Sequence, residues 1–172
     1  MRTKDLVLLA LFMGIGAVLH IISPPILFGM KPDIMLPMMF LGIMMFPKVS
    51  YVVVVSLATG VISALTTGAP GGQISNMIEK PITAFVFFGL LLLTSKYLKN
   101  KVVLPLLVIV GTAVSGSVFL VLALYIVGLM GGTFGAMFIG VVLPAILFNV
   151  IFMLIVYPIV QTVMQRSNFK YA

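Results

Sequence analysis

The sequence contains no cysteine and no tryptophan, only three acidic residues and one histidine. The absence of cysteine excludes disulfide bonds, thiolate nucleophiles and cysteine-based metal sites. A single histidine, with no His-Glu-x-x-His pattern and no serine, histidine and acid set, leaves little basis for hydrolytic catalysis. We therefore expect no enzyme activity, no metal and no cofactor.

Charge of either sign is scarce: 8% of the 172 residues are charged, whereas 62% are apolar. A water-soluble domain of this length needs more polar side chains to cover its surface. The net charge of +7 does not indicate nucleic-acid binding, because the basic residues lie between apolar runs and form no long cluster. The expected surroundings are therefore a lipid bilayer, and no nucleic-acid partner is predicted.

Charges and Pro/Gly clusters divide the chain into six apolar segments, roughly residues 5–22, 32–46, 49–67, 81–95, 102–128 and 135–164. Each is expected to cross the membrane as a helix, because backbone polar groups in lipid must be satisfied within the segment. The second and fourth segments are short, since a helix of about 15 residues reaches about 22 Å against a hydrocarbon core of about 30 Å. We predict one membrane-embedded domain over residues 1–172, an all-α bundle of six transmembrane helices.

The distribution of basic residues predicts that both termini are cytoplasmic. With the N-terminus inside, only Lys31 and Lys80 fall on the outer side. The remaining basic residues fall on the inner side: Arg2, Lys4, Lys48, Lys96, Lys99, Lys101, Arg166 and Lys170.

The sequence shows no energy source for transport. It has no Gly-x-x-x-x-Gly-Lys-Ser/Thr phosphate-binding loop, and all charged residues are expected at or outside the ends of spans. His20 is the one titratable group expected near the membrane interior, and packing near Pro24 and Pro25 is favoured over substrate or proton binding.

Polar residues gather in two predicted outer loops, residues 23–33 and 68–81. Lys31 and Lys80 balance Asp33 and Glu79, and such a set can bind the carboxylate and ammonium groups of an amino acid. The alternative is that these charges are solvated, pair with one another or cap helices.

The walls of a site would come from aromatic, thioether and amide side chains. Asn149, an amide near the middle of the last span, either packs across helices, which is favoured, or binds a ligand group. The complete set of predicted substrate-binding residues is Phe28, Met30, Lys31, Asp33, Gln73, Asn76, Glu79, Lys80 and Asn149.

Small side chains recur along the first span at Ala10, Gly14 and Ala17. Such stripes let helices approach closely, and internal packing is the default use of any one of them. Because a bundle without an energy source needs a partner, this stripe is the candidate docking surface.

Four stretches resemble a known family: residues 4–20, the Phe-Gly-Met-Lys-Pro-Asp run at residues 28–33, residues 40–43 and residues 73–76. They are similar to the substrate-binding S-components of energy-coupling factor (ECF) transporters, in particular the tryptophan-specific TrpP-like branch. The resemblance covers essentially the whole chain, and the Gly-Met-Lys-Pro-Asp stretch is its most specific part.

The resemblance implies a subunit of the bacterial cell membrane that binds L-tryptophan from outside. It also implies docking onto an ECF module of one transmembrane scaffold subunit and two ATPases. The family commonly docks through an Ala-x-x-x-Ala stripe on the first helix, and Ala10 and Gly14 occupy the matching positions. Two alternatives stay open: an autonomous proton- or sodium-coupled amino-acid carrier, and a structural membrane protein without a site.

Overall fold

The computed structural model describes residues 1–24, 31–97, 100, 102–128 and 130–166, and in this part of the chain all regular structure is helical. The prediction of an all-α protein is thus confirmed for these residues. The elements are α1 (Thr3–Ile22), α2 (Met35–Met45), α3 (Val49–Thr66), α4 (Gly72–Thr94), η1 (Ser95–Tyr97), α5 (Val103–Val121), η2 (Leu122–Ile126), α6 (Phe134–Met137), η3 (Phe138–Val142) and α7 (Leu143–Arg166).

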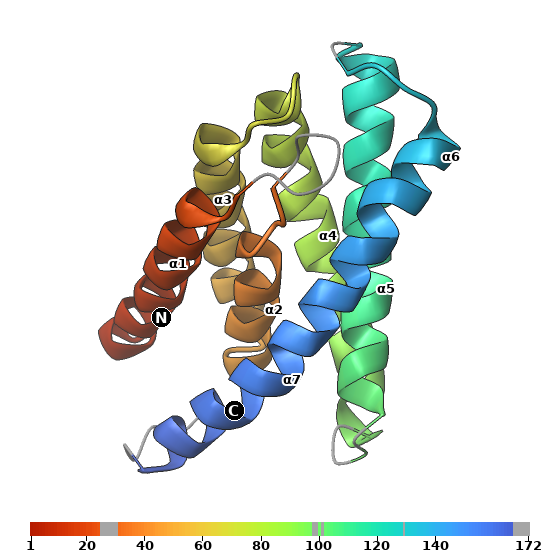
Figure 1. Ribbon diagram of the computed structural model, residues 1–172. Helices are drawn as coiled ribbons and strands as arrows, with labels where there is room; N and C mark the ends of the chain where they lie inside the picture. Colours follow the sequence, from red (N-terminus) through yellow and green to blue (C-terminus); the bar gives the residue numbers. More distant parts are fainter. Residues whose placement is uncertain (25–30, 98–99, 101, 129, 167–172) are drawn as a thin grey trace.

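Five continuous helical segments of the described chain are long and apolar enough to cross a membrane. They are Thr3–Ile22, Val49–Thr66, Gly72–Tyr97, Val103–Ile126 and Phe134–Arg166. In Val103–Ile126 the π-helical turn η2 continues α5 without a break. In Phe134–Arg166 the π-helical turn η3 joins α6 to α7 without a break. The start of α1 and the end of α7 lie toward the same end of the bundle (Figure 1).

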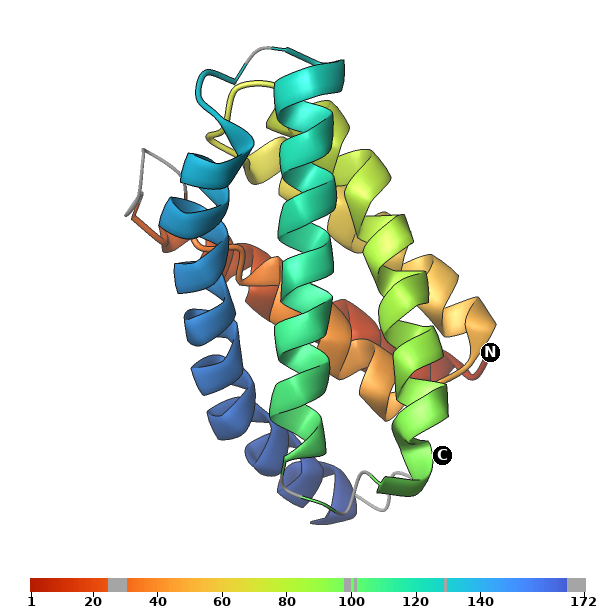
Figure 2. The same cartoon turned by 90° about the vertical axis from the view of Figure 1, so that its right-hand side faces the viewer.

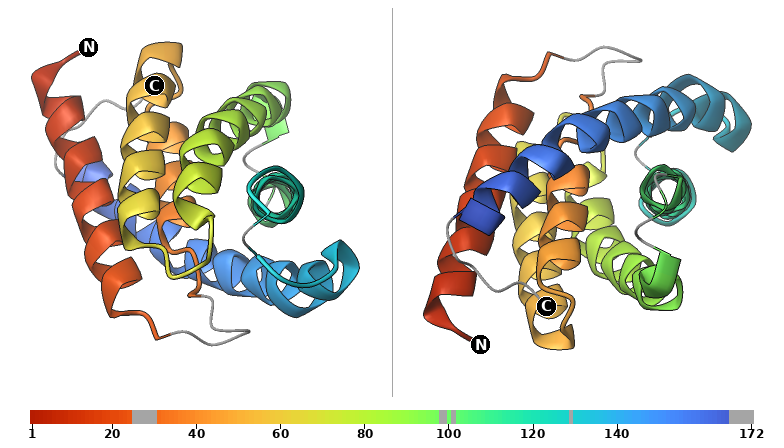
Figure 3. Two further views of the ribbon diagram at one scale, coloured as in Figure 1. Left: turned by 90° about the horizontal axis from the view of Figure 1, so that it is seen from above. Right: turned by 90° about the horizontal axis from the view of Figure 1, so that it is seen from below.

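The predicted second span is the exception, because α2 has only 11 residues. At 1.5 Å per residue it is about 16 Å long, roughly half the thickness of the hydrocarbon core. Every residue of α2 is buried, and the helix lies inside a ring of longer helices, as the views along the bundle show (Figure 3). The bundle therefore has five candidate spans around a short central helix.

The main core forms around α2. Phe40 stacks on Phe87 of α4, with ring centroids 4.0 Å apart and planes 7° apart. Gly111 lets α5 approach this pair, since a Cβ there would lie 2.7 Å from Cζ of Phe40. Figure 2 shows α5 between α4 and α7, and it packs against both.

The predicted fourth span begins at Gly72 rather than at Pro81, which lies inside α4. The interpretation of residues 72–80 as loop was wrong, because the charged pair and the proline resembled a helix boundary. The expectation that all charges lie at or outside span ends fails for the same reason: Glu79 and Lys80 are buried within α4. The fourth span is accordingly not short.

A second buried acid lies at the start of α1. Asp5 is 2% exposed, and its Oδ2 accepts hydrogen bonds from the Tyr51 hydroxyl at 2.6 Å and from Nε of Arg2 at 3.0 Å. This contact ties the first turns of α1 and α3 together.

Candidate functional site

A buried ion-pair cluster joins α4 to the segment that leads into α2. Nζ of Lys80 donates a hydrogen bond to Oδ2 of Asp33 and lies 2.9 Å from Oε2 of Glu79. The Lys80 side chain is 1% exposed and that of Glu79 is fully buried, whereas Asp33 is 27% exposed. Burying charges is costly unless they are paired, so Lys80 holds both acids in place.

Glu79 is fixed from two helices. Its Oε1 accepts hydrogen bonds from Oγ1 of Thr83, at 3.0 Å on α4, and from the hydroxyl of Ser115 on α5. The cluster therefore links α4, α5 and the chain before α2, which places it at the centre of the bundle.

Asp33 also faces the end of α1. Its Oδ1 lies 3.6 Å from Nδ1 of His20, and His20 is 5% exposed. This separation is too long for a hydrogen bond, and neither atom has a hydrogen-bond partner within the described chain. Two buried polar atoms at the edge of the cluster thus face one another without a hydrogen bond in the described chain.

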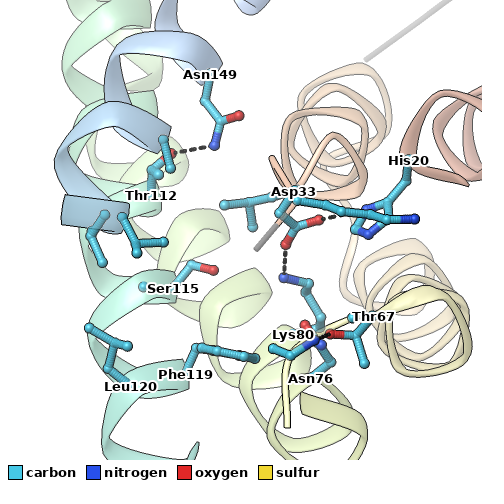
Figure 4. A pocket seen from close by; sticks show the side chains of 18 residues that line it. His20, Asp33, Thr67, Asn76, Lys80, Thr112, Ser115, Phe119, Leu120 and Asn149 are labelled. Atoms are coloured by element: carbon cyan, nitrogen blue, oxygen red, sulfur yellow. Dashed lines mark hydrogen bonds and ion pairs between the residues drawn. The ribbon is translucent and has the colours of Figure 1, made fainter. Parts of the chain in front are cut away.

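A cavity of about 110 Å³ opens beside the cluster (Figure 4). One water molecule needs roughly 10–15 Å³ on this measure, so the cavity has room for a small organic molecule. The lining residues are His20, Lys31, Asp33, Leu36, Thr67, Gly68, Ala69, Asn76, Lys80, Thr112, Ser115, Gly116, Phe119, Leu120, Val141, Val142, Ala145 and Asn149.

The two sides of the cavity differ in character. The charged side is formed by His20, Lys31, Asp33 and Lys80, from α1, α4 and the segment before α2. The opposite side is formed by α5, η3 and α7 and is mainly apolar. Its apolar residues are Phe119, Leu120, Val141, Val142 and Ala145. A ligand with a charged head and an apolar body matches this arrangement.

The apolar side contains one buried amide. Asn149 is 1% exposed, and its Nδ2 donates a hydrogen bond to Oγ1 of Thr112 at 3.2 Å. This bond joins the middle of the continuous helical segment Phe134–Arg166 to α5. The same residue nevertheless lines the cavity.

The structure brings together several residues that the sequence singled out. Lys31, Asp33, Asn76, Lys80 and Asn149 line the cavity, and Glu79 lies behind it, in contact with Lys80.

The remaining predicted residues are placed differently. Gln73 is exposed and is not part of the cavity wall that the structure describes. Phe28 and Met30 lie outside the described residues.

The capping role weighed for Asp33 is not seen. α2 has Ile34 at its N-cap and no side-chain capping bond, and Asp33 pairs with Lys80 instead. Asn76 lies inside α4, where its Nδ2 donates to the carbonyl oxygen of Gly72 at 2.7 Å.

Sequence reasoning missed the contribution of α5. Thr112, Ser115, Gly116 and Phe119 line the cavity from this helix. They are spaced at i, i+3, i+4 and i+7, which places them on one helix face. Two hydroxyl residues on one face of an otherwise apolar span were the available signal.

Within the described residues, no group of three or more His, Cys, Asp or Glu side chains is arranged to hold a metal ion. The chemistry of the cavity rests on ion pairing, hydrogen bonding and apolar contact.

Comparison with known proteins places the chain in a family. Residues 2–165 match the family model described as tryptophan transporter TrpP. A probable tryptophan transport protein of Bacillus subtilis is 56% identical over 172 residues, covering 100% of this chain and 99% of the relative. A protein of the same description from Clostridium acetobutylicum is 40% identical over 165 residues, covering 96% of each chain.

A third relative, from Clostridium perfringens, is 32% identical over 176 residues, covering 97% of this chain and 96% of its own length, and is also described as a probable tryptophan transport protein. No solved structure matches the chain. The resemblance noted in the sequence is thus confirmed over the whole length. The chain belongs to the tryptophan transporter TrpP family.

Proposed function

We propose that this chain is the substrate-binding membrane subunit for uptake of L-tryptophan and that it works with an ECF-type, ATP-driven module. The observation that carries the proposal is the cavity with one charged and one apolar side, inside a bundle of apolar helices. The identity of the proposed substrate comes from the relatives, which are described as probable tryptophan transport proteins.

The charged side suits the α-amino acid head of tryptophan. Two acids, Asp33 and Glu79, share the one ammonium group of Lys80, so the cluster has an excess of one acid over its lysine. The substrate ammonium group offsets this excess next to Oδ1 of Asp33, which has no hydrogen-bond partner in the described chain. The substrate carboxylate then pairs with Lys31, whose Nζ donates a 3.3 Å hydrogen bond to the backbone carbonyl of Ile21.

The apolar side suits the indole ring. Phe119, Leu120 and Val142 provide apolar surface, and removing an aromatic side chain from water is strongly favourable. Asn149 contributes an amide on this side of the cavity, and Asn76 lies beside Lys80 on the charged side (Figure 4). The site thus separates the two chemically distinct parts of one molecule.

The first helix supplies the docking surface in this proposal. Ala10 and Gly14 are exposed and Ala17 is half-buried, and a Cβ at Gly14 would have no atom within 4 Å. By contrast, a Cβ at Gly60 of α3 would lie 3.4 Å from the backbone of Asn76. The α1 stripe is therefore open to a partner helix, whereas the glycine of α3 serves internal packing.

The orientation follows from the excess of basic residues at one end of the bundle: both termini face the cytoplasm of a bacterial cell. The cavity is then loaded from outside. The two ATPases of the module supply the energy, since the sequence has no phosphate-binding loop of its own.

Fluorescence tests substrate binding directly. The chain contains no tryptophan, so added L-tryptophan is the one indole in the sample, and excitation beyond the tyrosine band reports it alone. Its emission is expected to shift to the blue when it enters the apolar side of the cavity. An unchanged spectrum at micromolar protein and ligand would contradict the proposal.

One observation favours a second candidate, a proton-coupled carrier. Glu79 is a fully buried carboxylate within a candidate span, and such groups often bind transported protons. Proteoliposomes separate the two functions. Accumulation of tryptophan by the chain alone, collapsed by an ionophore and indifferent to ATP, would favour the carrier.

A further inference from the structure

Asn149 lines the cavity, and one atom of its amide has no hydrogen bond within the described chain. Nδ2 is held by Thr112, but Oδ1 has less than 1 Å² of exposed surface and no hydrogen-bond partner within the described chain. Figure 4 shows the nitrogen toward Thr112 and the oxygen turned away from it. A buried carbonyl oxygen left unpaired destabilises a structure, so the position calls for a donor.

The surroundings of this oxygen determine which donor fits. Asn149 and Ala145 are one turn apart on α7, and both line the cavity on its apolar side with Leu120 and Val142. The charged groups Asp33 and Lys80 belong to the opposite side. The ammonium group of a substrate fits better on that charged side, because the carboxylates of Asp33 and Glu79 lie there. A neutral N–H on an otherwise apolar ring is the donor that fits beside Asn149.

We propose that Oδ1 of Asn149 accepts a hydrogen bond from the indole N–H of the bound substrate and so determines the preference for tryptophan. This inference rests on the proposed function. Thr112 acts as the positioning residue, because its Oγ1 accepts the hydrogen bond from Nδ2 and leaves Oδ1 as the amide atom without a partner in the described chain.

The physical consequence is that the site binds ligands without a ring N–H less tightly, because Oδ1 of Asn149 then lacks a donor. A site built to accept a hydrogen bond rejects an analogue of equal size that lacks the donor, because the buried acceptor then stays unpaired. Phenylalanine lacks the N–H and is smaller as well. β-(3-Benzothienyl)-L-alanine is the sharper probe, since sulfur replaces the N–H and the ring keeps nearly the same shape.

The test compares these two ligands on the purified full chain. Tryptophan binding is followed by its blue-shifted emission, and the analogue by displacement of tryptophan. We expect tryptophan to bind roughly tenfold to a hundredfold more tightly than the analogue, the effect of one unpaired buried acceptor. Equal affinities would overturn the inference while leaving the proposed function intact, whereas binding of neither ligand would overturn both.

Variants at two positions test whether Asn149 and Thr112 cause this difference in affinity. Asn149→Leu keeps the number and branching of the side-chain heavy atoms and removes the acceptor, so the affinity ratio is expected to fall to about one through weaker tryptophan binding. Thr112→Val frees the amide and is expected to reduce the ratio, and Thr112→Ser to restore it. Should Asn149→Leu fail to fold, the Thr112 pair tests the same geometry. An unchanged ratio in a folded Asn149→Leu or Thr112→Val chain would contradict the assignment.

Discussion

Nζ of Lys80 donates its hydrogen bond to Asp33, 47 residues earlier in the chain, and does so from within a helix and almost completely shielded from solvent. The two residues therefore join α4 to the start of α2 at the position where the cavity opens. The pair thus contributes both to the packing of the bundle and to the wall of the cavity.

Removal of Lys80 is expected to destabilise the protein strongly. Lys80→Met leaves the fully buried Glu79 and the partly exposed Asp33 without their cation, and breaking a buried pair costs about 3–5 kcal/mol. Thermal unfolding in detergent measures the loss, and Lys31→Met is the matched control because Lys31 is only half-buried. In a double-mutant cycle, Asp33→Asn should recover part of the loss. Additive effects would show that the two side chains do not interact.

Substitution of Gly111 is expected to disturb the core. A Cβ there would lie 2.7 Å from Phe40 and 3.0 Å from Phe87, so Gly111→Ala forces α5 away from the stacked rings. Overpacking of this kind costs typically about 1–3 kcal/mol. Gly135→Ala is the control, because a Cβ there has no atom within 4 Å. Equal melting temperatures of the two variants would argue against close contact between α5 and Phe40.

Gly14→Leu is expected to spare tryptophan binding and abolish ATP-dependent uptake. The added side chain meets no atom of this chain within 4 Å of its Cβ, but it would prevent a partner helix from approaching α1 closely. Gly89→Leu is the control on another helix, since it also has open space around its Cβ. Uptake is measured in proteoliposomes that contain the complete module. Loss of binding in Gly14→Leu would instead assign the stripe to internal packing.

Glu79→Gln separates the two transport mechanisms. The variant keeps an acceptor for Thr83 and Ser115 but removes one of the two acids that contact Lys80. We expect tryptophan affinity to fall by up to about tenfold, with ATP-driven uptake retained at saturating substrate. If the wild-type chain alone responds to a proton gradient and the variant does not, Glu79 carries the proton and the carrier mechanism holds.

The sequence was sufficient to predict the helical class and most of the spans, because long apolar runs have few other stable conformations in lipid. It was misleading at Glu79, Lys80 and Pro81, where charge and proline together indicated a loop. The helix continues through them because Asp33, Thr83 and Ser115 satisfy the charged side chains. No local pattern encodes partners that come from three different parts of the chain.

The residues of the site were predicted more fully than their arrangement. Lys31, Asp33 and Lys80 were recognised from their charge, and Asn149 from its position in an apolar span. Their division into a charged and an apolar side depends on how α5 and α7 pack beside α4. The hydroxyl pair Thr112 and Ser115 could have been found from its three-residue spacing on a helix.

The short, enclosed helix α2 affects how this protein reaches its folded state. Helical membrane proteins are commonly described as forming stable single helices first and associating them afterwards. A helix of 11 residues cannot hold itself across the bilayer, so for α2 the two stages coincide: it is stable only once its neighbours enclose it. Truncations that remove α1 or α3 should therefore leave α2 without a stable location, and biogenesis of the site depends on synthesis of the complete chain.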